Sequence, residues 1–266
     1  MQAPEPFVDI HCHLIPAIDD GSKSWDDSLA MARMAVDDGF ETTICTPHQM
    51  GTFAQNDGDL IRQRTDELQQ VLDEHDIPLE VLPGGDVRIE PDMIDGLRSG
   101  SVMSLADQRK HVLLELPHEV YFPLEQVLDN LRSIGMVGIL SHPERNEGLL
   151  RQPELLRPLV ERGCLMQVTA GSLMGTFGPH SQQLGERMLC EGLVHFLATD
   201  AHSSKKRRPL MQRAFEFAAK LVGWDIATDL CCRNPAAVAD GDDVEAVVYQ
   251  PSKKKSNGWF SWARSA

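Results

Sequence analysis

The sequence contains no uninterrupted apolar run of the roughly 18 residues that a membrane-spanning helix requires. Residues 1–15 also lack the basic start and the apolar stretch of a secretory signal peptide. We therefore expect a cytoplasmic protein. The chain has 266 residues, of which 42% are hydrophobic, and this is enough for one domain with a well-buried core.

Motifs of three common protein classes are also missing. No CxxC pair occurs among the six cysteines, so we expect buried, reduced thiols rather than disulfides or a zinc knuckle. No glycine-rich GxGxxG turn opens a helix, which disfavours a dinucleotide-binding fold. No cysteine is followed six positions later by arginine, as the phosphate loop of a cysteine-dependent tyrosine phosphatase requires.

Basic residues are few in this chain. Lys and Arg total 25 against 40 Asp and Glu, which gives a formal net charge of −15. A surface of this charge repels polyanions, and no basic stripe crosses the body of the chain, so we expect no nucleic-acid partner. A small phosphorylated substrate stays compatible, because a few local cations overcome the long-range field at close range.

Apolar runs rich in β-formers alternate with amphipathic segments along most of the chain. We expect strands at 7–13, 41–48, 79–87, 111–116, 136–142, 164–170 and 194–202. Helices are expected at 25–38, 57–76, 124–134, 154–162, 181–191 and 209–222. The repeated β/α alternation predicts an α/β fold whose parallel sheet closes as a barrel, in a single domain over residues 1–249. Residues 250–266 are basic and aromatic without helical periodicity, and we expect a flexible tail there.

Several of the expected strands end in an imidazole or a carboxylate. In a β/α barrel the carboxyl ends of the strands share one face, so residues far apart in sequence converge there. A single such His is usually only a hydrogen-bonding residue, but many together need divalent cations to satisfy their charges and lone pairs. The Asp19-Asp20-Gly21 turn follows the first strand, and Asp20 is the preferred further ligand of the two carboxylates. The candidate metal ligands are His11, His13, Asp20, His48, Asp86, Glu115, His142, Asp200 and His202.

The ligand types and the nearby arginines indicate the chemistry. Nitrogen and oxygen ligands without thiolate suit manganese, iron, zinc or magnesium, and nine ligands are enough for two or three ions. Such a cluster activates water for hydrolysis. Arg145 lies just beyond one expected ligand strand, and Arg207 and Arg208 lie just beyond another. Guanidinium groups bind phosphate oxygens in a two-pronged fashion, so the pattern predicts a metal-dependent phosphatase.

Seven segments, in this order and at these distances, resemble the PHP (polymerase and histidinol phosphatase) superfamily: DIHCHLIPAIDDGSKS, TPHQMGTF, LPGGDVRI, LLELP, SHPERN, AGSLMGTFG and ATDAHS. More narrowly, they resemble the bacterial CpsB/YwqE-like protein-tyrosine phosphatases of capsule and exopolysaccharide operons, over roughly residues 7 to 240. The resemblance implies a distorted (β/α)7 barrel with three metals, manganese first, held by the nine ligands above. It also implies that Arg145, with Arg207 or Arg208, holds phosphate. The implied partner is a bacterial tyrosine kinase carrying phosphotyrosine.

Two positions leave alternatives open within this resemblance. Asp86 stands where the family usually has Glu, which is one methylene and about 1.5 Å longer. If this residue bridges two ions, the spacing or the occupancy of the metal cluster differs. Arg207 fits the second phosphate-binding arginine by its distance from Asp200, whereas Arg208 fits by preceding Pro209.

Two other functions are weighed against protein-tyrosine phosphatase activity. One is hydrolysis of a small phosphate monoester such as histidinol phosphate, and the other is a catalytically silent partner of the kinase or of the polysaccharide machinery. The lysines at 253–255 and the aromatic residues at 259, 260 and 262 suggest a weak contact between the tail and an anionic membrane surface. The sequence leaves the oligomeric state open.

Overall fold

The computed structural model describes residue 3 and residues 5–244. The expected tail at 250–266, with the membrane contact suggested for it, lies outside the described residues. Within the described part of the chain, no helix has both the length and the apolarity needed to cross a bilayer.

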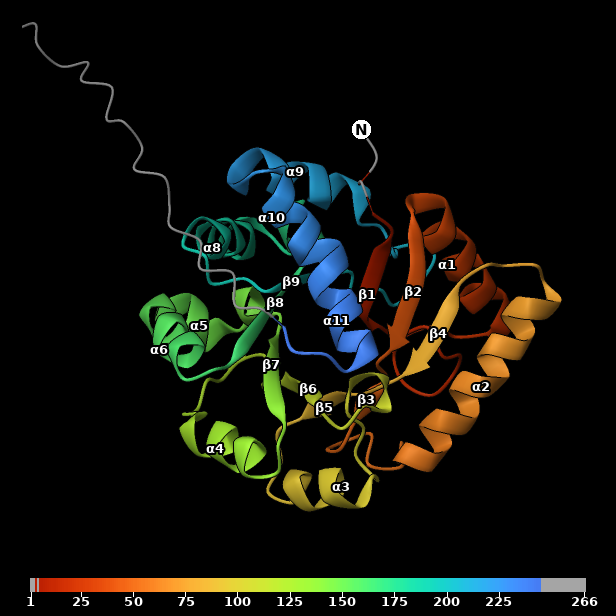
Figure 1. Cartoon of the computed structure of the whole chain (residues 1–266), viewed down its shortest axis with the longest axis horizontal. Helices are drawn as coiled ribbons and strands as arrows, with labels where there is room; N and C mark the ends of the chain where they lie inside the picture. The colour runs from red at the N-terminus through yellow and green to blue at the C-terminus, as the bar shows by residue number, and fades with distance from the viewer. Residues whose placement is uncertain (1–2, 4, 245–266) are drawn as a thin grey trace, which may run out of the picture.

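Parallel strands form the centre of the molecule (Figure 1). One sheet has the order β1-β2-β4, the other has the order β3-β5-β6-β7-β8-β9, and a single bridge between Cys12 and Ala201 joins the end of β1 to the chain just past β9. The expected α/β class with parallel strands is confirmed, but these hydrogen bonds do not form one continuous closed barrel sheet. The strands are β1 Phe7–Cys12, β2 Phe40–Cys45, β3 His48–Gln49, β4 Glu80–Pro83, β5 Asp86–Arg88, β6 His111–Glu115, β7 Val137–Ser141, β8 Leu165–Thr169 and β9 Phe196–Ala198.

Two of the expected strands are each interrupted once. The run 41–48 breaks into β2 and β3 around Pro47, which has no N–H to give to a ladder. The run 79–87 breaks into β4 and β5 at Gly84 and Gly85. A Cβ on Gly84 would lie 2.7 Å from Ile44 Cγ2, and one on Gly85 would lie 2.4 Å from Gln49 Oε1, so the neighbouring side chains leave no space for a Cβ at either position.

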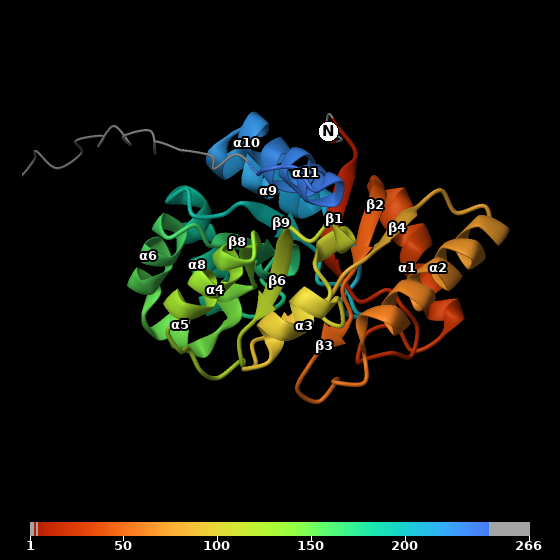
Figure 2. The ribbon, with the colours of Figure 1, turned by 60° about the horizontal axis from the view of Figure 1, so that its bottom comes forward.

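Helices cover the outside of the strands (Figures 1 and 2). In Figure 1, α9, α10 and α11 gather on one side of the molecule, and α11 crosses in front of the strands. The helices are α1 Trp25–Asp38, α2 Gly58–Glu74, α3 Met93–Ser99, α4 Glu125–Ser133, α5 Glu147–Arg151, α6 Leu156–Glu161, α7 Ala170–Leu173, α8 Pro179–Cys190, α9 Gln212–Val222, α10 Trp224–Thr228 and α11 Asn234–Asp240.

Buried apolar side chains of the described residues form three clusters: a larger one, a smaller one built mainly from strands, and a third between α3, α4 and β6. The larger one joins residues of the helices and strands, such as Met31 of α1 and Phe215 of α9. The smaller one takes buried side chains from β1, β2, β6, β7, β8 and β9, together with Val238 of α11. All six cysteines are free thiols, as expected, but Cys190 is exposed rather than buried.

Candidate metal centre

Two imidazoles stand at the carboxyl end of β1. His11 Nδ1 lies 2.9 Å from Gln167 Oε1, and His13 Nδ1 lies 2.7 Å from Asp19 Oδ2. Amide and carboxylate oxygens accept hydrogen bonds, so these partners place the proton on Nδ1 of both rings. The two Nε2 atoms then present lone pairs to each other across 3.3 Å. A cation beside them satisfies both lone pairs.

Neighbouring charges shift the pKa values of the two imidazoles in opposite directions. Burial, together with the nearby His202, lowers the pKa of His13 to about 4. Burial also opposes the charged form of His11, but Asp200 and Asp86 outweigh it and raise its pKa to about 9. The carboxylates around His11 therefore attract a positive charge, and binding of a metal ion would displace the proton.

Strands β3, β5 and β6 add His48, Asp86 and Glu115 to the site. His48 pairs with Asp86 in the ladder between β3 and β5, and its Nδ1 lies 3.2 Å from Asp86 Oδ2 and 3.5 Å from Glu115 Oε2. Asp86 is fully buried, and neither of its carboxylate oxygens has a hydrogen-bond partner among the described residues. Burial and the charge of Asp86 raise the pKa of Glu115 to about 7. A buried and a partly buried carboxylate whose ligand atoms lie within 4.8 Å of each other favour a cation between them.

Two of the expected ligands have a strained backbone. His142 has a φ of 34° and Asp200 a φ of 51°, in the left-handed region that non-glycine residues rarely occupy. Asp200 Oδ1 lies 3.3 Å from His11 Nε2 and 3.5 Å from His202 Nδ1. Strain of this kind persists where the surrounding structure holds it, typically at functional sites.

Asp20 closes the cluster from the loop after β1. Its Oδ1 lies 3.3 Å from His48 Nε2 and 3.4 Å from His202 Nε2. Asp20 is half-exposed, whereas His202 is buried beneath it. This carboxylate therefore lies at the entrance of the cluster, where a further ion would have access to solvent.

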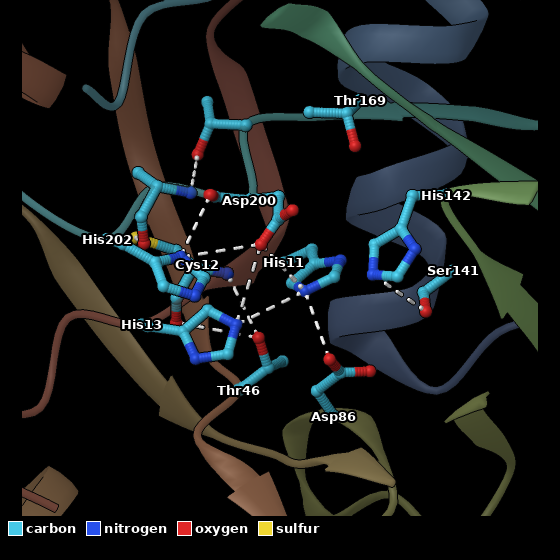
Figure 3. Close-up of polar contacts among 12 residues, drawn as sticks. His11, Cys12, His13, Thr46, Asp86, Ser141, His142, Thr169, Asp200 and His202 are labelled. Carbon is cyan, nitrogen blue, oxygen red and sulfur yellow. Dashed lines mark hydrogen bonds and ion pairs between the residues drawn. The ribbon is translucent and has the colours of Figure 1, made fainter. Parts of the chain in front are cut away.

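All nine expected ligands come together in the structure. Figure 3 shows the side chains of five of them grouped around a common centre: His11, His13, Asp86, Asp200 and His202. His142 lies on the other side of His11 from His13 and His202. They form four overlapping groups in which the candidate ligand atoms lie within 4.8 Å of one another. The groups are His13, Asp20, His48 and His202; His11, His142 and Asp200; His11, His13 and Asp86; and His48, Asp86 and Glu115.

The donor set and its unsatisfied atoms fit divalent metal ions. The ligand atoms are imidazole nitrogens and carboxylate oxygens, which suit borderline and hard cations. His48 Nδ1 and both oxygens of Asp86 are buried without a hydrogen-bond partner in the described chain. Buried polar atoms are normally paired, so their presence in one cluster is explained by coordination.

Two arginines approach the cluster from its rim. Arg145 Nη1 and Arg207 Nη2 each form an ion pair with Asp200 Oδ2, and both guanidinium groups lie over the ring of Phe177, at 4.1 Å and 5.7 Å from its centroid. Both arginines line a cavity of about 320 Å³ above the ligands. Arg208 instead lines a neighbouring pocket.

Some residues that orient the ligands and arginines were not among the expected site residues. Asp19 and Gln167 hold the two imidazoles of the first strand, and Phe177 packs against both arginines. Only the Asp19-Asp20-Gly21 turn gave a signal in the sequence, and it pointed to the other carboxylate. A Gln inside an apolar strand such as 164–170 is a weak signal, because buried polar residues need a partner that the sequence alone does not identify.

Comparison with known proteins gives consistent matches over almost the whole chain. The family model for capsular polysaccharide synthesis, CpsB/CapC, matches residues 7–240. The tyrosine-protein phosphatase YwqE of Bacillus subtilis is 38% identical over 222 residues, covering 83% of this chain and 87% of that protein. The putative tyrosine-protein phosphatase CapC of Staphylococcus aureus is 30% identical over 210 residues, covering 79% of this chain and 82% of that protein.

A solved structure agrees with these matches. It is described as one of the crystal structures of YwqE from Bacillus subtilis and CpsB from Streptococcus pneumoniae, unique metal-dependent tyrosine phosphatases. It superposes with a TM-score of 0.87 at 36% identity, and the match covers 93% of this chain and 100% of that chain.

Proposed function

This chain belongs to the capsular polysaccharide synthesis family CpsB/CapC, and on that premise we propose that it is a metal-dependent protein-tyrosine phosphatase. The observation that carries the proposal is the convergence of nine nitrogen and oxygen ligand residues under a cavity whose wall includes Arg145 and Arg207. Cys12, which lies between two of the ligands, is a poor candidate nucleophile, because it is buried and burial holds its thiol pKa well above the usual value.

The ligand groups would hold two or three divalent ions, with manganese expected and iron, zinc or magnesium as alternatives. Bound there, the ions would lower the pKa of a water molecule and neutralise negative charge on the phosphate oxygens. The chain orients its ligands through their outer partners. Asp19 and Gln167 keep the protonated Nδ1 atoms of His13 and His11 turned away from the cluster, so that each Nε2 faces it.

Arg145 and Arg207 would bind the phosphate group of the substrate. Both are held at the cavity by Asp200, and each guanidinium carries five donors, so donors are left over for phosphate oxygens. Arg207, rather than Arg208, is assigned this role because it lines the cavity. Tyrosine has an ordinary pKa of about 10, so its phenolate leaves without the dedicated proton donor that an alkyl phosphate needs.

The proposed substrate is phosphotyrosine on a protein, with a bacterial tyrosine kinase of polysaccharide synthesis as the proposed partner. Relatives that match most of this chain are named tyrosine-protein phosphatases, and the matching family is one of capsular polysaccharide synthesis. The site cavity has a volume of about 320 Å³, which lies at the small end of ligand pockets and suits a single phosphorylated side chain.

We also propose that the strands form a distorted seven-stranded barrel within one domain at 1–249. The pairings of Ile44 with Leu82 and of His48 with Asp86 have the same offset in residue number. The pair of strands β2 and β4 in one sheet therefore continues in the same register as the pair β3 and β5 in the other sheet. The bridge between Cys12 and Ala201 links the remaining edges. The smaller apolar cluster, which takes side chains from six strands, has the composition of a barrel interior.

The full-length protein, stripped of metal and then reloaded with one divalent ion at a time, tests the proposed function. Phosphate release would be measured on a phosphotyrosyl peptide, on p-nitrophenyl phosphate and on histidinol phosphate. We expect the stripped protein to be inactive, manganese to restore turnover, and the peptide to have the highest kcat/KM. A higher kcat/KM on histidinol phosphate would point to the small-molecule function, and an intact fold that neither binds metal nor hydrolyses aryl phosphate would point to a silent partner.

A further inference from the structure

A second pocket lies beside the metal cavity and is strongly basic. Its lining includes Lys206, Arg207, Arg208 and Arg213, and no acidic residue among those the structure describes. The chain as a whole carries 40 acidic and 25 basic residues, so four clustered cations, of which only Arg207 is paired with a carboxylate, form a marked local reversal of its field. A site of this kind attracts an anion.

Three of these cations are available to a ligand. Lys206, Arg208 and Arg213 are exposed, and none of them forms an ion pair with a carboxylate within residues 5–244. Arg207 differs, because its guanidinium is engaged by Asp200 at the metal cavity. The pocket therefore presents unpaired positive charge next to the groups that would hold phosphate.

The positive charge of Arg213 is not stabilised by its local structure. Arg213 lies in the first turn of α9, where the helix dipole disfavours a cation. The carboxylate at this helix end, Asp38, accepts hydrogen bonds from the N–H groups of Met211 and Gln212, the latter at 2.9 Å. Asp38 and Arg213 form no ion pair in the described structure.

The two cavities share a wall. Arg207 lines both of them, and Phe177, which lines the basic pocket, packs against Arg145 and Arg207. The basic pocket has a volume of about 140 Å³, whereas one water molecule occupies about 30 Å³ in the liquid. It has room for one side chain but not for a sugar chain or a nucleotide.

We propose that this pocket binds an acidic side chain of the substrate polypeptide, close in sequence to the phosphotyrosine. The inference rests on the proposed function, because it takes the phosphotyrosine to occupy the metal cavity. Lys206, Arg208 and Arg213 then select acidic neighbours, and the phenyl ring of Phe177 forms the apolar wall between the two bound groups.

The experiment compares three phosphotyrosyl peptides that differ only in whether the flanking residues are Glu, Gln or Lys. With the metal-loaded full-length enzyme, we expect kcat/KM for the Glu peptide to exceed that for the Gln peptide about five- to tenfold, a size typical of a few exposed charge pairs. The difference should lie in KM, because a contact away from phosphorus binds the ground state and the transition state equally. It should also shrink at high ionic strength.

Variants assign the preference to the pocket. Lys206→Gln with Arg213→Gln should reduce the Glu-to-Gln ratio to about twofold or less. Lys206→Glu with Arg213→Glu should favour the Lys peptide. The control, Lys205→Gln with Lys220→Gln, removes the same charge from exposed positions outside the pocket and should keep the wild-type ratio. Each ratio is measured on one enzyme, so partial loss of folded protein cancels.

The outcomes separate this inference from the proposed function. Equal kcat/KM for the three peptides, or a preference that survives in both pocket variants, would overturn the inference and leave the phosphatase standing. If the enzyme hydrolysed p-nitrophenyl phosphate but none of the peptides, the proposed protein substrate would fall, and the inference with it.

Discussion

Asp86 is a buried carboxylate at the bottom of the candidate metal centre. It is fully buried, His48 Nδ1 lies 3.2 Å and His11 Nε2 3.6 Å from its Oδ2, and neither oxygen has a hydrogen-bond partner in the described chain. A glutamate at this position would place its oxygens about 1.5 Å further along. In this protein the shorter side chain still reaches two imidazoles.

Replacing the Asp86 carboxylate by an amide tests whether its charge holds a cation. Asp86→Asn keeps the shape but removes the charge, so we expect about one ion fewer per chain and a kcat lowered about 100-fold or more. Metal content after dialysis, measured by mass spectrometry beside phosphatase rates, checks this. Asp86→Glu, the matched control, should keep more metal than the amide variant. Full metal content and normal turnover in Asp86→Asn would contradict the assignment.

The two adjacent arginines can be separated by conservative substitutions. Arg207→Lys keeps a charge but loses the two-pronged guanidinium, so kcat/KM for p-nitrophenyl phosphate should fall about 100- to 1000-fold. Arg208→Lys should lower it far less, because Arg208 lines the neighbouring pocket. Steady-state kinetics on this small substrate decide between them. The reverse order of effects would assign phosphate binding to Arg208.

The sequence indicated the candidate ligands more clearly than the residues that orient them. All nine candidate ligands lie together in the structure, and each follows an apolar strand or its loop, which is a local pattern. Gln167 contacts His11 from 156 residues away, and no local pattern reports that contact. Arg207 and Arg208 could not be separated either, since the direction of a loop side chain depends on tertiary packing.

At the scale of elements, the clearest local signals gave the most accurate boundaries. Helix α1 was predicted to the residue, because Ser24 caps its first turn through Asp27 N and Gly39 ends it in the left-handed region. The short helices α3, α5, α7, α10 and α11 were not predicted. These five helices have seven residues or fewer, too few for a clear helical period, so they depend on tertiary contacts.

The loop after β7 depends on one side chain. Asn146 Oδ1 accepts a hydrogen bond from Leu149 N at the start of α5, and its Nδ2 donates to the carbonyl oxygens of Pro117 at 2.8 Å and Val120 at 3.0 Å. This residue is 4% exposed. It joins the loop that carries Arg145 to the loop that follows β6.

Removing that side chain should destabilise both loops. Asn146→Ala should lower the free energy of unfolding by about 2–4 kcal/mol, because one helix cap is lost and the carbonyl groups of Pro117 and Val120 lose their donor. The exposed cap variant Ser24→Ala, the control, should cost about 1 kcal/mol. Urea unfolding of the metal-free proteins measures both. Equal costs would show that the two hydrogen bonds to the β6 loop contribute little.

At the scale of the whole molecule, total charge and local charge have different consequences. From the net charge of −15 we predicted that the protein has no nucleic-acid partner. This charge describes the surface as a whole and not any single pocket. The basic pocket was not predicted, because its lining comes from separate segments of the chain. Arg213 belongs to α9, Lys206 to the loop before α9, and Phe177 to a loop earlier in the sequence. Only the packing of α9 against α7 and α8 brings those segments together.

Stability against acid is a property of the whole molecule to which His195 contributes. This histidine is buried outside the metal cluster, its Nδ1 accepts a hydrogen bond from Met166 N at 3.1 Å, and burial lowers its pKa to about 4. An unfolded histidine titrates near 6.5, so below that pH the unfolded chain takes up a proton that the native chain refuses. The stability that depends on neutral His195 is therefore lost as the pH falls from about 6.5 to about 4, up to about 3 kcal/mol.

His195→Asn offers an oxygen acceptor to Met166 N and cannot titrate, so urea unfolding of the metal-free variant should show a shallower loss over this range than the wild type. Parallel curves for the two proteins would show that His195 is protonated in the native state, and that its hydrogen bond from Met166 does not hold it neutral.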